Sequence, residues 1–155
     1  MLEIERKFLV KGDFHPYVTK KERIVQAYLA TSLERTVRIR IKGSDAFISI
    51  KGASNKNGFS RLEFEYTIPV PDAQKLLELA LPGRIEKERH YIPFGNHLFE
   101  VDVFQGDKAG LIVAELELQS ESESFEKPDW LGKEVTGDER YYNAYLASHS
   151  ISELI

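Results

Sequence analysis

The sequence predicts a mainly β protein whose antiparallel strands form a closed or nearly closed barrel. Seven or eight short segments have the composition of strands, and most of them alternate charged and apolar residues at the strand period of two. Turn residues such as Gly43, Ser44 and Asp45 separate neighbouring segments, so most strands are expected to be joined as hairpins. Few segments have helical spacing. Many hairpin-connected strands with few helices are typical of a barrel.

Length and composition limit the classes of protein to consider. A chain of 155 residues fits one domain, over residues 1–155, with a sizeable core. The net charge of −4 predicts no nucleic-acid polymer as a partner, and the absence of cysteine excludes disulfides, thiolate metal sites and a cysteine nucleophile. The first residues do not have the pattern of a signal peptide, because they include two Glu and no apolar run, so we expect none. No apolar run approaches the roughly 18 residues that cross a bilayer. We expect a cytoplasmic monomer or homodimer without membrane contact.

The first half of the chain is read mainly as strands. Residues 3–10 alternate as a strand, and residues 12–19 form a loop with at most one turn of helix. Residues 23–30 fit either a helix or a strand, because their apolar residues suit both periods. Three further strands are expected at 35–42, 46–51 and 61–68, the first two as a hairpin, with a polar loop over 53–60.

The second half adds two short helices. Asp72 is read as the N-cap of a helix over 72–81, which Pro82 and Gly83 end. Thr136 and Glu139 have capping-box spacing, which predicts a last helix over 140–148. Strands are expected between them at 85–92, 98–104 and 111–118, with turns at 93–96 and 105–107 and a polar loop over 120–128.

Nearly every predicted strand has one charged side and one apolar side. For a single strand a solvated polar face explains this pattern, since antiparallel strands usually have a wet side. Like charges two residues apart repel each other, however, so their recurrence favours a multivalent partner: phosphate oxygens for Arg and Lys, a divalent metal for carboxylates. The charged sides comprise Glu3, Glu5 and Lys7; Arg38 and Arg40; Lys51; Arg61, Glu63 and Glu65; Lys87 and Arg89; Glu100 and Asp102; and Glu115 and Glu117.

If the sheet closed with its charged side inward, the basic residues and the carboxylates would share one lumen and could act together on a polyphosphate. A polyphosphate needs several cations along its length, and a hard divalent cation bridges phosphate oxygens. Together they position an attacking water and stabilise charge on the leaving phosphate. No Ser-His-Asp set is visible, because the four histidines stand singly near loops or strand ends: His15, His90, His97 and His149.

The ordered set of charged motifs resembles the CYTH superfamily, the triphosphate tunnel metalloenzymes, over essentially the whole chain. Glu-x-Glu-x-Lys at 3–7 matches the family signature, and residues 132–143 look like its closing motif. Gln26 and Tyr28 resemble the short bacterial branch, although Ala27 stands where Gly is common. The resemblance implies an eight-stranded antiparallel tunnel with a charged lumen and a few flanking helices, the last of which packs at one end.

The resemblance also implies roles for individual residues. Mg²⁺ or Mn²⁺ would be bound by Glu3, Glu5, Asp102, Glu115 and Glu117. The triphosphate would be held by Lys7, Arg38, Arg40, Lys51, Lys87 and Arg89, with further contacts from Arg61 and from Lys133, which is equally well read as a surface lysine. Glu5 and Lys7 would have catalytic roles. Glu63 and Glu65 would orient neighbouring residues, bind a second metal ion or activate water. Tyr28 would either act in catalysis or serve only as a packing residue.

Family members hydrolyse inorganic tripolyphosphate, hydrolyse thiamine triphosphate or cyclise ATP, and the shared tunnel residues do not separate these activities. An organic substrate needs an apolar, usually aromatic, platform, whereas the only tryptophan, Trp130, lies in a polar stretch. We therefore expect metal-dependent hydrolysis of tripolyphosphate to pyrophosphate and phosphate. The alternatives are hydrolysis of thiamine triphosphate or a nucleoside triphosphate, class IV-type adenylate cyclisation, and a non-enzymatic polyphosphate-binding module, which the carboxylates disfavour.

Overall fold

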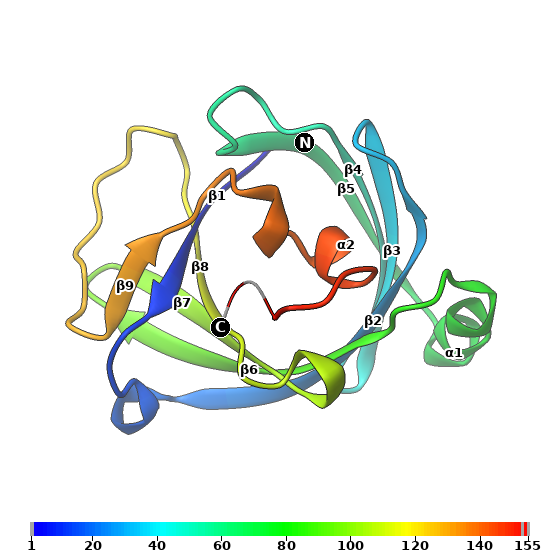
Figure 1. Ribbon diagram of the computed structural model, residues 1–155, viewed down its shortest axis with the longest axis horizontal. Helices are drawn as coiled ribbons and strands as arrows, with labels where there is room; N and C mark the ends of the chain where they lie inside the picture. Colours follow the sequence, from blue (N-terminus) through cyan, green and yellow to red (C-terminus); the bar gives the residue numbers. More distant parts are fainter. Residues whose placement is uncertain (1, 153, 155) are drawn as a thin grey trace.

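The protein is a closed antiparallel barrel of eight strands (Figure 1). The structure is a computed structural model that describes residues 2–152 and 154. Around the barrel the strands follow the order β5-β4-β3-β2-β6-β7-β8-β1, and β1 pairs with β5 to close the ring. The predicted eight-stranded tunnel is confirmed. The strands are β1 (Leu2–Val10), β2 (Lys20–Thr31), β3 (Arg35–Lys42), β4 (Asp45–Gly52), β5 (Ser60–Ile68), β6 (Ile85–Phe94), β7 (His97–Phe104) and β8 (Ile112–Glu117).

Strand β1 closes the barrel because different parts of it pair with different neighbours. Residues 2–4 pair with β5 and residues 5–9 pair with β8. A ninth strand, β9 (Leu131–Glu134), also pairs with β1, through Phe8 and Val10. Strand β9 was not predicted from the sequence, because its four residues are too few to show an alternating pattern. The segment over 23–30, which fitted either period, lies within strand β2.

The helices are short and lie beside the barrel or at its end. A 3-10 turn, η1 (His15–Tyr17), occupies the expected loop, and a second, η2 (Gly106–Lys108), follows β7. Helix α1 (Val70–Leu79) begins two residues before the predicted start, and the predicted Asp72 cap is wrong. Pro69 is the N-cap residue, and Pro71 suits the first turn because its fixed φ is already helical. Among the described residues, none of the helices is both long and apolar enough to cross a membrane.

The predicted last helix over 140–148 is much shorter in the structure. A 3-10 turn, η3 (Glu139–Tyr141), precedes α2 (Asn143–Leu146), because extended backbone at Tyr142 separates them. The predicted capping box is also wrong. Thr136 Oγ1 instead accepts a hydrogen bond from the backbone N–H of Lys7, while Asp138 caps η3 by accepting from Arg140 N–H.

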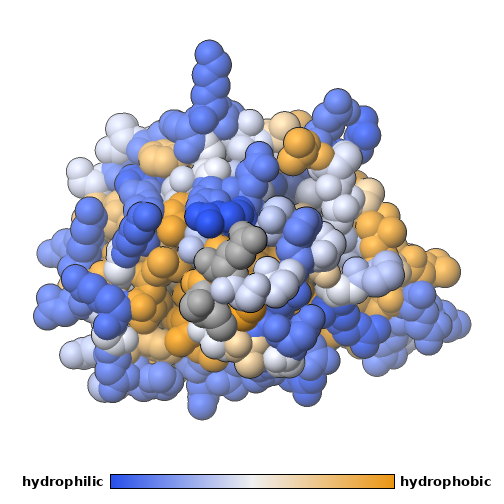
Figure 2. Space-filling view, viewed as in Figure 1, coloured by the Kyte–Doolittle hydropathy of each residue, from blue (hydrophilic) through white to orange (hydrophobic). Residues whose placement is uncertain are grey.

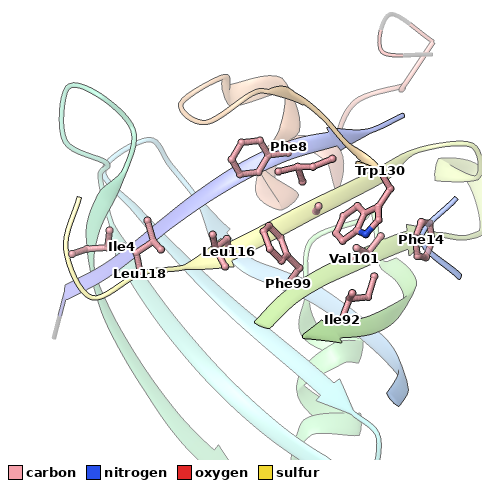
Figure 3. Packing of buried hydrophobic residues seen from close by; sticks show 11 residues of the cluster. Ile4, Phe8, Phe14, Ile92, Phe99, Val101, Leu116, Leu118 and Trp130 are labelled. Atoms are coloured by element: carbon pink, nitrogen blue, oxygen red, sulfur yellow. The ribbon is translucent and has the colours of Figure 1, made fainter. Parts of the chain in front are cut away.

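Two of the three apolar clusters lie on the outside of the barrel. The outer faces of β1, β6, β7 and β8 pack against Trp130 and its neighbours, with Phe8 and Phe99 at the centre (Figure 3). Helix α1 covers the outer faces of β2, β3 and β4, where Leu77 packs beside Ala27 and Ile39. The charged residues of the strands therefore face the lumen, and the apolar residues that alternate with them face outward.

The third cluster lies inside one end of the barrel. Figure 1 shows α2 within the ring of strands, in agreement with the expected packing role of the last helix. The inward residues Tyr28, Ile85 and Phe104 pack there against Tyr141 and Leu146. In the same view, Figure 2 shows hydrophilic side chains over most of this face, with smaller hydrophobic groups between them. The lumen is thus apolar where α2 enters and charged beyond it.

Candidate functional site

The lumen contains a cavity of about 170 Å³ with a strongly polar lining. Strict alternation along each strand sends the charged residues inward, and the closed ring brings them together from seven of its eight strands. The predicted residues on its wall are Glu3, Glu5, Lys7, Tyr28, Arg38, Arg40, Lys51, Arg61, Glu63, Glu65, Arg89, Glu115 and Glu117. Thr36, Lys42, Ser49, Glu100, Asn143 and Ala144 complete the lining.

The cavity has a basic wall and an acidic wall that face each other. Strands β3 and β8 lie four places apart in the ring of eight strands, so they are opposite one another. Arg38 and Arg40 come from β3, and Glu115 and Glu117 come from β8. An anion with a bound cation can therefore contact the arginines on one side while the cation contacts carboxylates on the other.

Carboxylates on the acidic wall lie directly opposite each other on neighbouring strands. Glu5 pairs with Glu117, and Glu100 pairs with Glu115. Burial raises the pKa of Glu5, and the charges of Glu115 and Glu3 raise it further. Burial also raises the pKa of Glu117, again with repulsion from neighbouring carboxylates. Crowded carboxylates that resist ionisation are stabilised by a cation, so this wall fits a hard, oxygen-binding metal ion such as Mg²⁺ or Mn²⁺.

The side chains of the acidic wall do not yet converge on one point. Within residues 2–152 and 154, no three Asp, Glu or His side chains form a ready metal site. Internal cations explain the spread, because Lys51 Nζ lies 2.8 Å from Glu3 Oε1 and Lys7 Nζ lies 3.6 Å from Glu115 Oε1. Although burial opposes the shift, Lys7 and Arg89 lower the pKa of Glu115 to about 2. The ligand roles of Glu3, Glu5, Glu115 and Glu117 stay predictions.

The basic wall contains a hydrogen-bond donor without an acceptor. Arg38 Nη2 donates to Ser49 Oγ at 3.1 Å and lies 3.6 Å from Glu65 Oε2. Arg38 Nε is buried and has no partner, and in the described part of the chain it is the only buried side-chain nitrogen or oxygen in this state. An unpaired buried donor costs stability, so this position favours an anionic acceptor in the cavity.

Asp102 lies beneath the cavity wall and is held by two cations. Its carboxylate accepts hydrogen bonds from Arg89 Nε at 2.8 Å and Arg89 Nη2 at 2.9 Å, and Lys87 Nζ lies 2.6 Å away. Burial alone raises its pKa, but Arg89 and Lys87 hold that pKa well below its usual range. Asp102 does not line the cavity, whereas Glu100 on the same strand does. The structure therefore places Glu100, rather than the predicted Asp102, with the other carboxylates.

Lys87 is fully buried and connects Asp102 to the C-terminal helix. Its Nζ donates to Asn143 Oδ1 at 2.8 Å, and Gln26 Nε2 donates to the same oxygen at 2.8 Å. Gln26 Oε1 in turn accepts from Arg40 Nε at 2.7 Å. Asn143 and Gln26 thus link two predicted phosphate-binding cations to α2. Sequence reasoning missed the role of Asn143, for which its place at the end of the closing motif was the available signal.

Burial and crowding of positive charge change how these cations titrate. Burial lowers the pKa of Lys87 to about 7, with Arg89 and Arg40 adding to the effect and Asp102 opposing it. Burial lowers the pKa of Arg40 to about 9, with Arg38 and Arg89 as further causes. A cation that is costly to keep charged gains from an added anion, so the basic wall fits a polyanionic ligand.

The remaining predicted residues divide between the cavity and the surface. Arg61 Nε lies 3.8 Å from Glu3 Oε1, and Lys51 Nζ lies 3.6 Å from Glu63 Oε2, so these residues form ion pairs in the lumen. Lys133 is exposed on β9, and the structure does not bring it to the cavity. The charged cavity is also lined by none of the four histidines.

A second cavity of about 550 Å³ adjoins the charged one beside α2. It shares Thr36, Arg61 and Ala144 with the charged cavity. Its other side includes Tyr142, Tyr145 and His149, and the Tyr145 and His149 rings stack with centroids 3.6 Å apart. Aromatic surface therefore lies next to the charged lumen, which the sequence did not lead us to expect.

Comparison with known proteins agrees with this architecture. Residues 1–143 match the family model of the CYTH domain. The chain is 43% identical over 148 residues to the inorganic triphosphatase of Acetivibrio thermocellus, covering 95% of this chain and 94% of that protein. It is 38% identical over 156 aligned positions to the inorganic triphosphatase of Nitrosomonas europaea, covering 95% and 97%. A crystal structure of an inorganic triphosphatase superposes with a TM-score of 0.67 at 34% identity, covering 93% of this chain and 96% of that one. The chain belongs to the CYTH domain family.

Proposed function

We propose that this protein hydrolyses inorganic tripolyphosphate to pyrophosphate and phosphate with the help of a divalent metal ion. The observation that carries the proposal is the pair of facing walls, cationic on β3 and carboxylate on β8, inside a closed barrel. Similarity over nearly the full length to two proteins named inorganic triphosphatase supports it. Water adds to a terminal phosphorus, and the adjoining P–O–P bond breaks so that its electron pair stays on the pyrophosphate oxygen. One proton of the water stays on the phosphate formed, and the other passes to a product oxygen or to solvent.

The cations of the lumen would hold the substrate along its length. Arg38 offers an unpaired donor to a phosphate oxygen, and Arg40 and Lys51 stand on the neighbouring inward positions of β3 and β4. Charge-assisted hydrogen bonds of this kind are roughly twice as strong as neutral ones. Lys7 and Arg89 lie between the two walls, where they already contact Glu115. They would stabilise charge that develops on the departing pyrophosphate.

The acidic wall would hold Mg²⁺ or Mn²⁺ through Glu3, Glu5, Glu115 and Glu117, with Glu100 as an added candidate. When bound, the ion would polarise a phosphoryl oxygen and lower the pKa of a bound water. Glu63 and Glu65 lie beside Lys51 and Arg38, so they would orient these cations. Lys87 and Asp102 would support the site from beneath its wall.

A second candidate function is hydrolysis of an organic triphosphate. The aromatic second cavity beside the lumen favours it, because Tyr142 and Tyr145 offer the apolar surface that such a substrate needs. Its shared wall with the charged cavity would let one ligand occupy both. The names of the two relatives support the inorganic substrate, which is why we place it first.

The deciding experiment is a panel of substrates tested for phosphate release with Mg²⁺, with Mn²⁺ and with EDTA. We expect fastest turnover of tripolyphosphate with metal and none with EDTA. Higher kcat/KM for thiamine triphosphate or a nucleoside triphosphate would select the second candidate, and cyclic nucleotide from ATP would indicate a cyclase. Tight tripolyphosphate binding without metal-dependent turnover would overturn the enzymatic proposal. Glu5→Gln is the variant to compare with the wild type. It should lose turnover but keep the fold, since it keeps the alternating pattern and removes one carboxylate charge.

A further inference from the structure

The outer face of β5 carries large apolar side chains in water. Leu62, Phe64 and Tyr66 are 50%, 41% and 56% exposed. They alternate with Arg61, Glu63 and Glu65, which point into the lumen. Because the charged residues of β5 face inward, the pleat forces its apolar residues outward.

The apolar surface continues onto both neighbouring strands. Leu2 of β1 lies directly opposite Leu62, and Ile50 of β4 lies directly opposite Phe64. Leu2 is 64% exposed and Ile50 is 39% exposed. Ile48, which is half-buried, lies opposite Tyr66. We call Leu2, Ile50, Leu62, Phe64 and Tyr66 the β5 patch.

The other apolar outer faces of the barrel are covered by the chain itself. Trp130 and its neighbours cover β1, β6, β7 and β8, and α1 covers β2, β3 and the start of β4. No segment of residues 2–152 covers the β5 patch in this way, because its five side chains remain exposed. Isolated exposed apolar residues are ordinary in proteins, but a contiguous set on one sheet face indicates an interaction surface.

The size of the β5 patch fits a protein interface. A fully exposed large apolar side chain offers on the order of 200 Å², so the five residues at their observed exposures present roughly 500 Å². A standard interface buries about 800 Å² on each partner, and homodimer interfaces are about 65% apolar, which requires about 520 Å² of apolar surface. The patch supplies that amount from one copy.

The chemistry of the β5 patch favours a second copy of the same chain. None of its five members is charged, so it offers nothing complementary to a charged peptide, a nucleic acid or a lipid headgroup. An isologous two-fold contact needs only that the patch be complementary to itself, which an uncharged apolar sheet face satisfies. Two-fold dimers are also the commonest soluble oligomers.

We propose that the β5 patch is the interface of a homodimer, formed by face-to-face packing of the β4–β5 walls of two barrels. The contact lies directly behind Arg61, Glu63 and Glu65, because these residues occupy the other side of the same strand. The interface leaves the lumen of each copy free. It does not depend on the reaction proposed above.

The test is the mass of the protein in solution, measured by sedimentation velocity and light scattering without substrate. We expect the wild type to be a dimer and Phe64→Lys to be a monomer. Leu79→Lys is the matched control, since Leu79 is 76% exposed on α1 and is not a member of the β5 patch, and this variant should remain a dimer. Circular dichroism checks folding, and Leu62→Lys repeats the test if Phe64→Lys does not fold.

Three results would overturn the proposal. The first is a wild type that stays monomeric up to about 100 μM, well above a micromolar dissociation constant. The second is a dimer that persists in folded Phe64→Lys and Leu62→Lys. The third is equal loss of the dimer in Leu79→Lys, which would place the interface elsewhere or make the effect one of charge alone.

Discussion

Lys87 Nζ lies 2.6 Å from Asp102 Oδ2, and both side chains are shut off from solvent. The same carboxylate accepts two hydrogen bonds from Arg89. One buried anion therefore serves two buried cations beneath the wall of the cavity. Removing one member of such a group leaves charge in the protein interior without compensation.

We expect Asp102→Asn to lower the free energy of unfolding by about 3–5 kcal/mol, because Lys87 and Arg89 lose their shared anion. Urea titration measures this change. Glu100→Gln is the control, since Glu100 shares the inward face of β7 but is 28% exposed and lies 3.5 Å from Arg89 Nη1. Its loss should stay below about 1 kcal/mol. Equal losses in the two variants would show that Asp102 is not the anchor of the cations.

The two hydrogen bonds to Asn143 Oδ1 make a second prediction. Asn143→Ala leaves Gln26 Nε2 without its acceptor and Lys87 with Asp102 alone, which costs about 1–3 kcal/mol of stability. Since Gln26 also holds Arg40, the KM for tripolyphosphate should rise. Ser148→Ala, near the same chain end but exposed, should change neither quantity. Thermal unfolding and steady-state kinetics compare the two, and an Asn143→Ala variant that matches Ser148→Ala in both would contradict the prediction.

Arg38→Lys separates the charge of Arg38 from its unpaired donor. The variant keeps a cation but loses Nε and the planar fork, so the KM for tripolyphosphate should rise roughly tenfold to a hundredfold. The loss of Nε itself should cost no stability, because that donor has no partner in the protein. Lys133→Met serves as the control, since Lys133 is exposed outside the cavity. An unchanged KM in Arg38→Lys, or an equal rise in Lys133→Met, would contradict a direct contact between Arg38 and the substrate.

The raised pKa of Glu5 predicts how stability without metal depends on pH. Its ordinary value is 4.5, and burial raises it, as do Glu115 and Glu3. Between the ordinary and the raised pKa, the folded protein holds a proton that the unfolded chain has released, so the free energy of unfolding falls as pH rises through this window. Above the raised pKa the loss from Glu5 is complete.

Glu5→Gln should remove this loss. In EDTA the variant should equal the wild type below about pH 4 and exceed it in stability at pH 7. Mg²⁺ should raise the stability of the wild type more than that of the variant, because a cation stabilises the ionised carboxylate. Urea unfolding between pH 4 and pH 7 measures both effects. A variant less stable than the wild type at pH 7 without metal would show that Lys7 outweighs the repulsion.

Strict alternation explains why so much of the lumen was predictable. Each charged pair, such as Arg38 with Arg40, shares one strand face, and closing the barrel requires that face to point inward or outward as a whole. Depth along the barrel is not part of that pattern. Glu100 and Asp102 are equivalent at a period of two, yet one lines the cavity and the other lies beneath it. The sequence therefore predicted which residues face the lumen, but not which of them line the cavity and which lie beneath it.

The features that sequence reasoning missed depend on tertiary contacts. Thr136 has capping-box spacing, but β1 recruits its hydroxyl, so the helix begins later. Asn143 is a single neutral residue whose importance comes from meeting Lys87 and Gln26 across the barrel. The exposed outer face of β5 was read only as an apolar side, because whether α1 covers a strand depends on where the chain places the helix.

The charged lumen also alters the thermal behaviour of the protein. Unfolding an ordinary domain raises the heat capacity by about 12–15 cal/mol/K per residue, since newly wetted apolar surface adds to it and newly wetted polar surface subtracts from it. Here unfolding hydrates a barrel full of charged groups, while Phe64 and Tyr66 are already partly wet in one copy of the chain. The heat-capacity increment of the monomer should fall below that range, which flattens its stability curve and widens the span of temperatures over which the barrel stays folded.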